Sequence, residues 1–469
     1  VPTKNKIDTF DIKKVDKNKL YEFLREMEFN RLLSQAISFY GEPEGKIAQQ
    51  NTKSISKKID VAKYKTINKI TDLDKLIKNL EDKSLISVDT ETSSLNPLDA
   101  DLVGISVCYS PNEAYYIPVK HKIEKCLNKK VIIEKIKKIL EDKSIKKIGQ
   151  NIKFDNLILK KEGININPIE DTMLLSYTLD AGLNRHNLDT LSEIHLDHKT
   201  ISYKDLVGSG KNKLIFEEVD LKKSTEYAGE DADVTFRLFD ILKSRLDEEK
   251  LNIIYESFEK PLVQILSQIE MNGIKINTDY LKKLSTNFTN KIKKIEKEIF
   301  LIAKKEFNIG SPKQLGEIIY NELKIANQKK TKKGSLATNA NILEDLAFKG
   351  HKFPRLVLDW RQLSKLKNTY TDALQEHVNS KTKRVHTSFL LAATNTGRLA
   401  SSDPNLQNIP IKTDDGREIR KAFIAEKNNI LISADYNQIE MRILADLAEV
   451  KELQKAFLNN EDIHVLTAS

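Results

Sequence analysis

Apolar residues recur along the chain at two kinds of spacing, which predict two kinds of domain. Between residues 66 and 245, apolar runs at 85–88, 102–109, 114–119 and 145–149 predict strands, and segments of helical periodicity at 131–140, 154–162, 171–180, 186–196 and 221–245 alternate with them. This alternation predicts an α/β domain with a mixed sheet. After residue 250 the pattern changes to long helices, with one apolar stripe at Phe288, Ile292, Ile295, Ile299 and Ile302.

Segments near the two ends of the chain add further predicted elements. Residues 20–29 read as a short amphipathic helix, and the polar stretch 41–58 that follows has the composition of a linker. Near the other end, the apolar run 430–434 predicts a strand that ends at Asp435, followed by a helix with one apolar face. An acid at a strand end can hold a metal ion, but Asp is also a favoured helix N-cap, so position alone leaves both roles open.

Composition narrows the class of protein. The 469 residues exceed one ordinary core, so we expect two or three domains. A net charge of +9 favours an anionic partner such as nucleic acid, although the heavy use of Lys throughout the chain explains the charge equally well. Two cysteines cannot form a multi-cysteine zinc site or a disulfide framework. No apolar stretch approaches the length of a membrane span, so we expect a cytoplasmic protein.

Three acidic segments carry the candidate chemistry. Asp89 and Glu91 stand at i and i+2 at the end of a predicted strand, where both side chains share a face. Tyr227 and Asp231 stand at i and i+4 of a predicted helix and also share a face, and Asp155 lies between the two segments. Carboxylate pairs are common in a chain that is 31% charged. Their order within a span of domain size nevertheless favours a metal-dependent phosphodiesterase, because hard oxygen ligands suit Mg²⁺ or Mn²⁺.

These segments resemble the three motifs of the proofreading 3′→5′ exonucleases, which carry four acids and a tyrosine. The flanking sequences are similar to the exonuclease domain of bacterial A-family DNA polymerases in residues 89–95, 148–151, 171–177 and 227–235. The resemblance implies a ribonuclease-H-like fold, with a mixed sheet and flanking helices.

The resemblance also implies a role for each motif residue. Asp89, Glu91 and Asp231 would hold the ion that activates water, and Asp89 would share a second Mg²⁺ or Mn²⁺ ion with Asp155. Tyr227 would orient the nucleophile. Near the frayed 3′ end of the DNA, the expected binding residues are Leu95 and Asn151.

A second resemblance covers the rest of the chain. Residues 434–444, which contain Asp435 and Glu440, are similar to motif A of the A-family DNA polymerases, and residues 396–399 and 403–410 are similar to the segment before it. Residues 270–276 and 365–372 are similar to the thumb region. After residue 250 the resemblance therefore implies a mainly helical thumb and the start of a polymerase palm.

The polymerase resemblance again implies particular residues. Asp435 would ligate both metal ions of the polymerase site, and Glu440 would exclude a ribose 2′-hydroxyl. Arg398 would lie at the primer terminus, with Asn405 and Gln407 near the template–primer. Deoxynucleoside triphosphates would be substrates of the full-length parent. The second metal-binding acid of the family does not occur before Ser469 and the chain opens at Val1, so we expect a fragment truncated at both ends that cannot extend a primer.

The sequence thus predicts three regions. Residues 1–65 would be the tail of a 5′-nuclease region and a linker, residues 66–245 a 3′→5′ exonuclease domain, and residues 250–469 a truncated A-family polymerase domain. We expect a monomeric DNA-binding enzyme of replication and repair with no membrane partner. The alternatives are a stand-alone 3′→5′ exonuclease and a DNA-binding fragment without catalytic activity.

Overall fold

The computed structural model describes residues 15–27, 29–41, 58–210, 213–326, 336–461 and 463, and divides into two compact units, Val1–Lys57 and Lys58–Ser469. In the first unit, α1 (Lys17–Glu26) forms where the amphipathic helix is predicted, and α2 (Asn30–Tyr40) was not predicted. Tyr21 is fully buried, and its hydroxyl donates a 2.5 Å hydrogen bond to the carbonyl of Gly41. Nearly all of the predicted linker, residues 42–57, lies outside the described residues.

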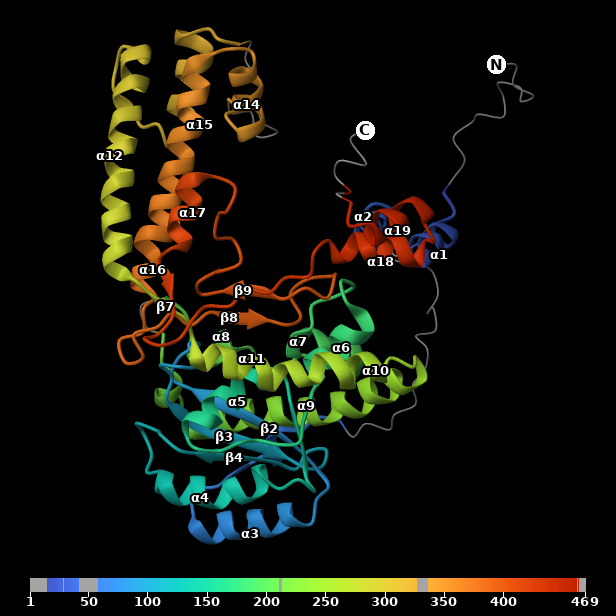
Figure 1. The fold of residues 1–469 in the computed structure, drawn as a ribbon. Helices are drawn as coiled ribbons and strands as arrows, with labels where there is room; N and C mark the ends of the chain where they lie inside the picture. The colour runs from blue at the N-terminus through green and yellow to red at the C-terminus, as the bar shows by residue number, and fades with distance from the viewer. Residues whose placement is uncertain are drawn as a thin grey trace, which may run out of the picture. The chain divides into compact units, whose positions relative to one another are not determined.

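The α/β part of the second unit is built on a six-stranded mixed sheet (Figure 1), in the order β1-β4-β3-β2-β5-β6. Its strands are β1 (Lys65–Thr66), β2 (Leu85–Thr92), β3 (Leu102–Cys108), β4 (Ala114–Pro118), β5 (Lys146–Gly149) and β6 (Ile169–Asp171). The β2–β3 and β3–β4 pairs are antiparallel, and the other pairs are parallel. Every residue of β3 is buried, as expected of a central strand covered on both faces.

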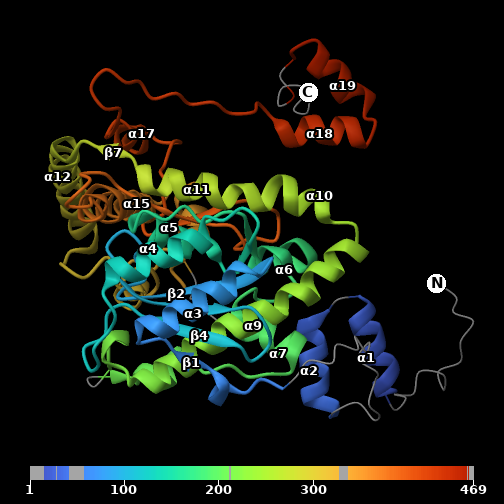
Figure 2. The same ribbon diagram turned by 90° about the horizontal axis from the view of Figure 1, so that it is seen from below.

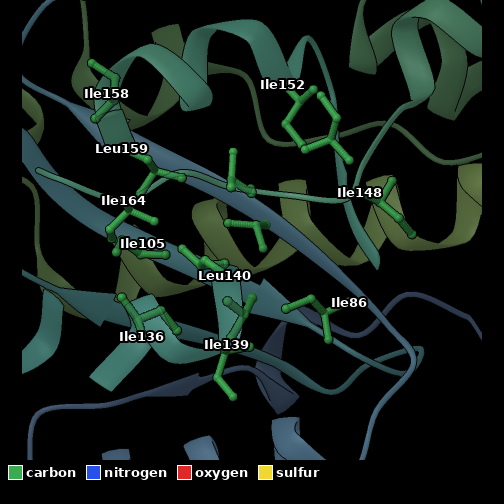
Figure 3. Packing of buried hydrophobic residues seen from close by; sticks show 14 of the residues in the cluster. Ile86, Ile105, Ile136, Ile139, Leu140, Ile148, Ile152, Ile158, Leu159 and Ile164 are labelled. Atoms are coloured by element: carbon green, nitrogen blue, oxygen red, sulfur yellow. The ribbon is translucent and has the colours of Figure 1, made fainter. Parts of the chain in front are cut away.

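Helices cover this sheet and complete the first α/β part. They are α3 (Ile70–Glu81), α4 (Lys129–Leu140), α5 (Ile152–Lys161), α6 (Thr172–Asp180), α7 (Leu188–Leu196), α8 (Tyr203–Val207) and α9 (Leu221–Glu248). Isoleucine and leucine side chains of α4 and α5 pack with those of β2, β3 and β5 in one buried cluster (Figure 3). The carboxylate of Asp220 caps α9 by accepting from the backbone N–H groups of Lys222 and Lys223.

The predicted elements of this part are confirmed to within a few residues, and the mixed α/β class is confirmed with them. The sequence pattern missed α3, α8 and the short strands β1 and β6. Two or three residues are too few to show an alternation of apolar and polar positions, so strands of this length leave no periodic signal.

A helical region follows the α/β part. The run α10 (Asn252–Ile254), η5 (Tyr255–Glu259) and α11 (Lys260–Asn272) is continuous along the chain and lies beside the α/β part, where α11 contacts α5 (Figures 1 and 2). Beyond it, α12 (Thr278–Ala303) packs along α15 (Lys352–Lys365). The predicted apolar stripe of α12 faces the core, because Phe288 and Ile299 are fully buried.

Shorter elements complete this region. The helical ones are α13 (Pro312–Glu317), η6 (Ile318–Glu322), α14 (Ala340–Phe348), η7 (Leu366–Asp372), α16 (Ala373–Glu376), α17 (Asp414–Arg420), α18 (Ile439–Leu447) and α19 (Lys451–Leu458). Two small antiparallel sheets join them, one of β7 (Lys275–Ile276) with β10 (Phe423–Ile424) and one of β8 (Ser388–Leu390) with β9 (Ala400–Ser402).

The predicted strand at 430–434 is wrong. These residues adopt no strand in the structure, and Ile430 and Ile432 are 80% and 82% exposed. Among the described residues no segment pairs with them, and an isolated strand would leave its N–H and C=O groups without partners. The helix predicted after Asp435 does form, as α18, but Gln438 rather than Asp435 stands at its N-cap. In the part of the chain that the structure describes, no helix is both long and apolar enough to span a membrane.

Candidate metal centre and nucleic-acid surfaces

β2 brings the first two acids of the site together. Asp89 and Glu91 project from the same face of this strand because side chains two residues apart share a face. The register with β3 places Glu91 opposite Gly104. A Cβ atom at Gly104 would lie 2.3 Å from the hydroxyl of Tyr116, so only glycine leaves room for this buried ring beneath the site.

The long helix α9 supplies the third acid and the tyrosine. Ligand oxygens of Asp89, Glu91 and Asp231 all lie within 4.8 Å of one another. Tyr227 stands one helical turn before Asp231, and its hydroxyl is hydrogen-bonded to the Asp231 carboxylate. Asp89 and Asp231 are 142 positions apart in the chain and nevertheless meet at one point. Their spacing in the sequence does not predict this contact.

Asp155 lies beside this group, in the first turn of α5. It is 2% exposed, and its Oδ1 atom accepts hydrogen bonds from the Thr90 N–H at 2.9 Å and the Thr90 hydroxyl at 2.6 Å. Thr90 stands between Asp89 and Glu91, so these bonds tie the fourth acid to the centre of the acidic strand segment. The second oxygen of Asp155 has no part in these two bonds.

The start of α5 is fixed by another aspartate. Asp171 accepts from the N–H groups of Asn151 and Ile152 at 3.1 and 3.0 Å, and it also caps α6. Asn151 itself adopts the left-handed conformation, with φ 59°, and its side chain is exposed. Asn residues tolerate this conformation better than most others. The predicted DNA-binding residue Asn151 thus lies at the N-terminus of the helix that carries Asp155.

Burial and mutual repulsion shape the electrostatics of the four acids. Burial raises the pKa of Asp89 from 3.8 to about 6. The pKa of Glu91 is raised well above its ordinary value by burial and then by the charges of Asp89, Asp231 and Asp155. Burial followed by the charge of Asp89 raises the pKa values of Asp155 and Asp231 in the same way. Four neighbouring carboxylates are therefore hard to ionise together without a cation.

A divalent cation fits this donor set. Glu91 Oε1 is buried and, among the described residues, has no hydrogen-bond partner, so one carboxylate oxygen of the group is left unsatisfied. Carboxylate oxygens are the ligands that Mg²⁺ and Mn²⁺ prefer, and a cation would relieve the repulsion that raises these pKa values. The group is thus compatible with a divalent metal site.

An aromatic wall that the sequence analysis missed borders the acids. Tyr203, on α8, is 44% exposed, and its ring meets that of Tyr227 edge to face at 6.2 Å. Phe216 supports Tyr227 from another side at 6.1 Å. Burial and then the charge of Glu91 raise the pKa of Tyr203, so this residue lies within the electrostatic range of the acidic group. A lone tyrosine in a polar segment carries no motif, so only the packing of α8 on α9 reveals this wall.

The two residues of the exonuclease region that are predicted to contact DNA lie at the surface. Leu95 follows β2 and is 93% exposed. Asn151 is exposed at the start of α5.

The predicted polymerase residues lie in the C-terminal part of the helical region, where Gln407 donates a hydrogen bond to the carbonyl of Leu399, next to Arg398. Asn405 and Gln407 line a cleft of about 1230 Å³ between the helices η7 and α16 and the segment 401–413. Arg398 is exposed and forms an ion pair with Glu440 of α18. Asp435 is exposed in an irregular segment. Its expected place at the end of a strand is therefore wrong, because the strand that would support it is not formed.

Comparisons with known proteins find two families along the chain. Residues 64–247 match the family model for the 3′-5′ exonuclease, and residues 278–469 match that for DNA polymerase family A. DNA polymerase I of Rhizobium leguminosarum is 45% identical over 430 residues, which cover 87% of this chain and 42% of the relative. DNA polymerase I of Borreliella burgdorferi is 44% identical, with 87% and 44% covered. The chain spans less than half the length of these two relatives.

A solved structure shows the same similarity. The fold superposes with a TM-score of 0.71 on the POL domain of Pol1 from M. smegmatis in complex with DNA primer-template and dNTP. The two are 27% identical, and the match covers 85% of this chain and 65% of that one.

Proposed function

Because the chain belongs through residues 64–247 to the 3′-5′ exonucleases and through residues 278–469 to DNA polymerase family A, we propose that it removes nucleotides from the 3′ end of DNA. The single observation that supports this most is the convergence of Asp89, Glu91 and Asp231 within 4.8 Å. In the proposed reaction, water attacks the terminal phosphodiester, the bond to the 3′ oxygen of the preceding nucleotide breaks, and a nucleoside 5′-monophosphate leaves.

The acids supply the electrostatic part of this function. Asp89, Glu91 and Asp231 would hold one Mg²⁺ or Mn²⁺ ion. Asp89 and Asp155 would hold a second ion. Two such ions would activate water and stabilise negative charge on the phosphate. The hydrogen bonds from Thr90 hold Asp155 in place, and the unpartnered oxygen of Glu91 stays available as a ligand.

Tyr227 and Tyr203 would act on water and on the substrate. Burial and the charges of Asp231, Glu91 and Asp89 raise the pKa of Tyr227, so the phenol stays protonated at neutral pH and can orient a water molecule. The exposed ring of Tyr203 offers a stacking surface for a base beside the acids, and each base stacked on an aromatic ring typically contributes about 1–3 kcal/mol to binding.

The polymerase region would hold DNA. Asn405 and Gln407 line the cleft of about 1230 Å³ together with Lys365 and Lys412, whose positive charges suit a polyanionic partner. Arg398 would lie at the primer terminus. Asp435 and Glu440 would serve nucleotide addition in a longer polymerase, with deoxynucleoside triphosphates as substrates. This assignment is supported by the match of residues 278–469 to DNA polymerase family A, which also speaks against a stand-alone nuclease.

Digestion of labelled DNA tests the proposal. A single-stranded oligonucleotide that carries a 3′-terminal label should lose that label as a mononucleotide in the presence of Mg²⁺, while a 5′ label should remain on progressively shorter products. A chain that binds the oligonucleotide but releases no mononucleotide would instead be the non-catalytic DNA-binding fragment.

A further inference from the structure

Glu230 precedes Asp231 on α9, and its carboxylate binds a different part of the structure from the acids of the proposed metal centre. This residue is 1% exposed. One carboxylate oxygen lies 2.8 Å from Nε2 of His198, and the other accepts a 2.6 Å hydrogen bond from the backbone N–H of Ile201. Both oxygens are thus engaged, and Glu230 does not belong to the group of close acids formed by its neighbour.

The segment that Glu230 holds, residues 198–202, leads directly into the aromatic wall. The opposite side of this segment is fixed by α7, where the Ser192 hydroxyl donates to the carbonyl of His198 at 2.8 Å and Asp189 accepts from Thr200 at 2.6 Å. Ser202 then caps α8. Tyr203 is the first residue of α8 and lies two positions after Ile201, so any movement of this segment moves its ring.

We propose that Glu230 is a positioning residue for substrate, which through Ile201 and His198 fixes Tyr203 against Tyr227. This inference rests on the proposed exonuclease function. On α9, successive residues thereby have separate roles, since Asp231 faces the acidic cluster and Glu230 anchors the wall beside it.

The route of this effect predicts its kinetic form. Tyr203 borders the acids but is not one of them, so displacement of its ring should weaken binding of the terminal nucleotides and leave the hydrolytic group intact. Loss of Glu230 should therefore raise KM more than it lowers kcat. A defect passed on to Asp231 would instead lower kcat.

A double-mutant cycle on the full chain, with single-stranded DNA and Mg²⁺, tests this inference. Tyr203→Ala and Glu230→Ala should each raise KM roughly tenfold, as expected for one lost stacked base, with kcat within about twofold of the original value. Combining them should add little beyond Tyr203→Ala, because both act through the same ring. Glu230→Gln should be close to the original chain, since its amide oxygen still accepts from Ile201. Glu226→Ala, one turn earlier on α9, is the matched control.

Three results would overturn the inference. The KM increase of the double variant could equal the product of the two single increases, Glu230→Ala could lower kcat without changing KM, or Glu230→Ala could leave KM unchanged. Should Glu230→Ala fail to fold, as judged by its thermal unfolding, His198→Ala takes its place in the same cycle and is read by the same criterion. That side chain is 26% exposed and tolerates truncation better. If the unaltered chain releases no mononucleotide at all, the proposed function itself is wrong. If the unaltered chain is active but the KM effects of the two variants multiply, only the role proposed for Glu230 is wrong.

Discussion

Replacing Asp89 with Asn should separate stability from function at the acidic group. The raised pKa means that the native state binds the Asp89 proton more tightly than the unfolded chain does. Ionisation of Asp89 therefore destabilises the fold as the pH rises from 3.8 to about 6, and this cost is fully present at pH 7.5. A difference of roughly 2 pK units corresponds to about 3 kcal/mol, as an upper limit.

Asn removes that charge while keeping the shape of the side chain. Because Asp89 is only partly buried, solvent screening reduces the gain, and we expect the free energy of unfolding without metal to rise by about 1–2 kcal/mol. Saturating Mg²⁺, at a hundred times its dissociation constant, should stabilise the original chain by about 2.7 kcal/mol and the variant by much less. Exonuclease activity should fall roughly a thousandfold, since loss of about 4 kcal/mol of transition-state stabilisation corresponds to that factor.

Urea unfolding at pH 7.5, with and without Mg²⁺, together with the digestion rate, measures all three effects. Asp82→Asn, an exposed aspartate just before β2, is the matched control and should change none of them. A variant that is less stable than the original chain in the absence of metal would mean that favourable partners, and not a cation, hold the Asp89 carboxylate. A variant that keeps near-full digestion would mean that hydrolysis does not need this carboxylate.

Three further predictions concern the same region. Digestion should rise with pH through about 6, the pKa of Asp89, and more Mg²⁺ should shift this rise to lower pH because the cation binds the ionised acids; a pH profile unaffected by Mg²⁺ would contradict this. Lys153→Met should lower the free energy of unfolding by about 3–5 kcal/mol in urea, because it leaves Glu270 buried without the 2.5 Å ion pair; a loss below 1 kcal/mol would count against it. Gly104→Ala should cost about 1–3 kcal/mol in thermal unfolding by displacing Tyr116, and unchanged stability would show that the ring has room to move.

Periodicity and spacing predict much of the fold, and they do so where elements are long. The helix over 221–245 and the strand that ends in Asp89 and Glu91 both form, because each repeats its pattern over several turns or residues. Strand β1, with two residues, has no pattern to read. The run 430–434 shows the converse, since a strand-like sequence forms no strand where no described segment pairs with it.

Spacing predicts part of the candidate site as well. It places Asp89 beside Glu91 and Tyr227 beside Asp231, because each pair lies within one element. That the two pairs meet depends on the packing of α9 against β2, which only the resemblance to a known family implied. Tyr203 was missed for the same reason, because its contact with Tyr227 joins two helices. The roles of all these residues remain predictions until variants are measured.

Anomalous scattering from crystals soaked in Mn²⁺ tests the metal centre most directly. We expect a peak among the carboxylates of Asp89, Glu91 and Asp231, bonded to oxygens of at least two of them and absent from Asp89→Asn crystals. Bound Mn²⁺ elsewhere, or no peak at a concentration that supports digestion, would contradict this expectation.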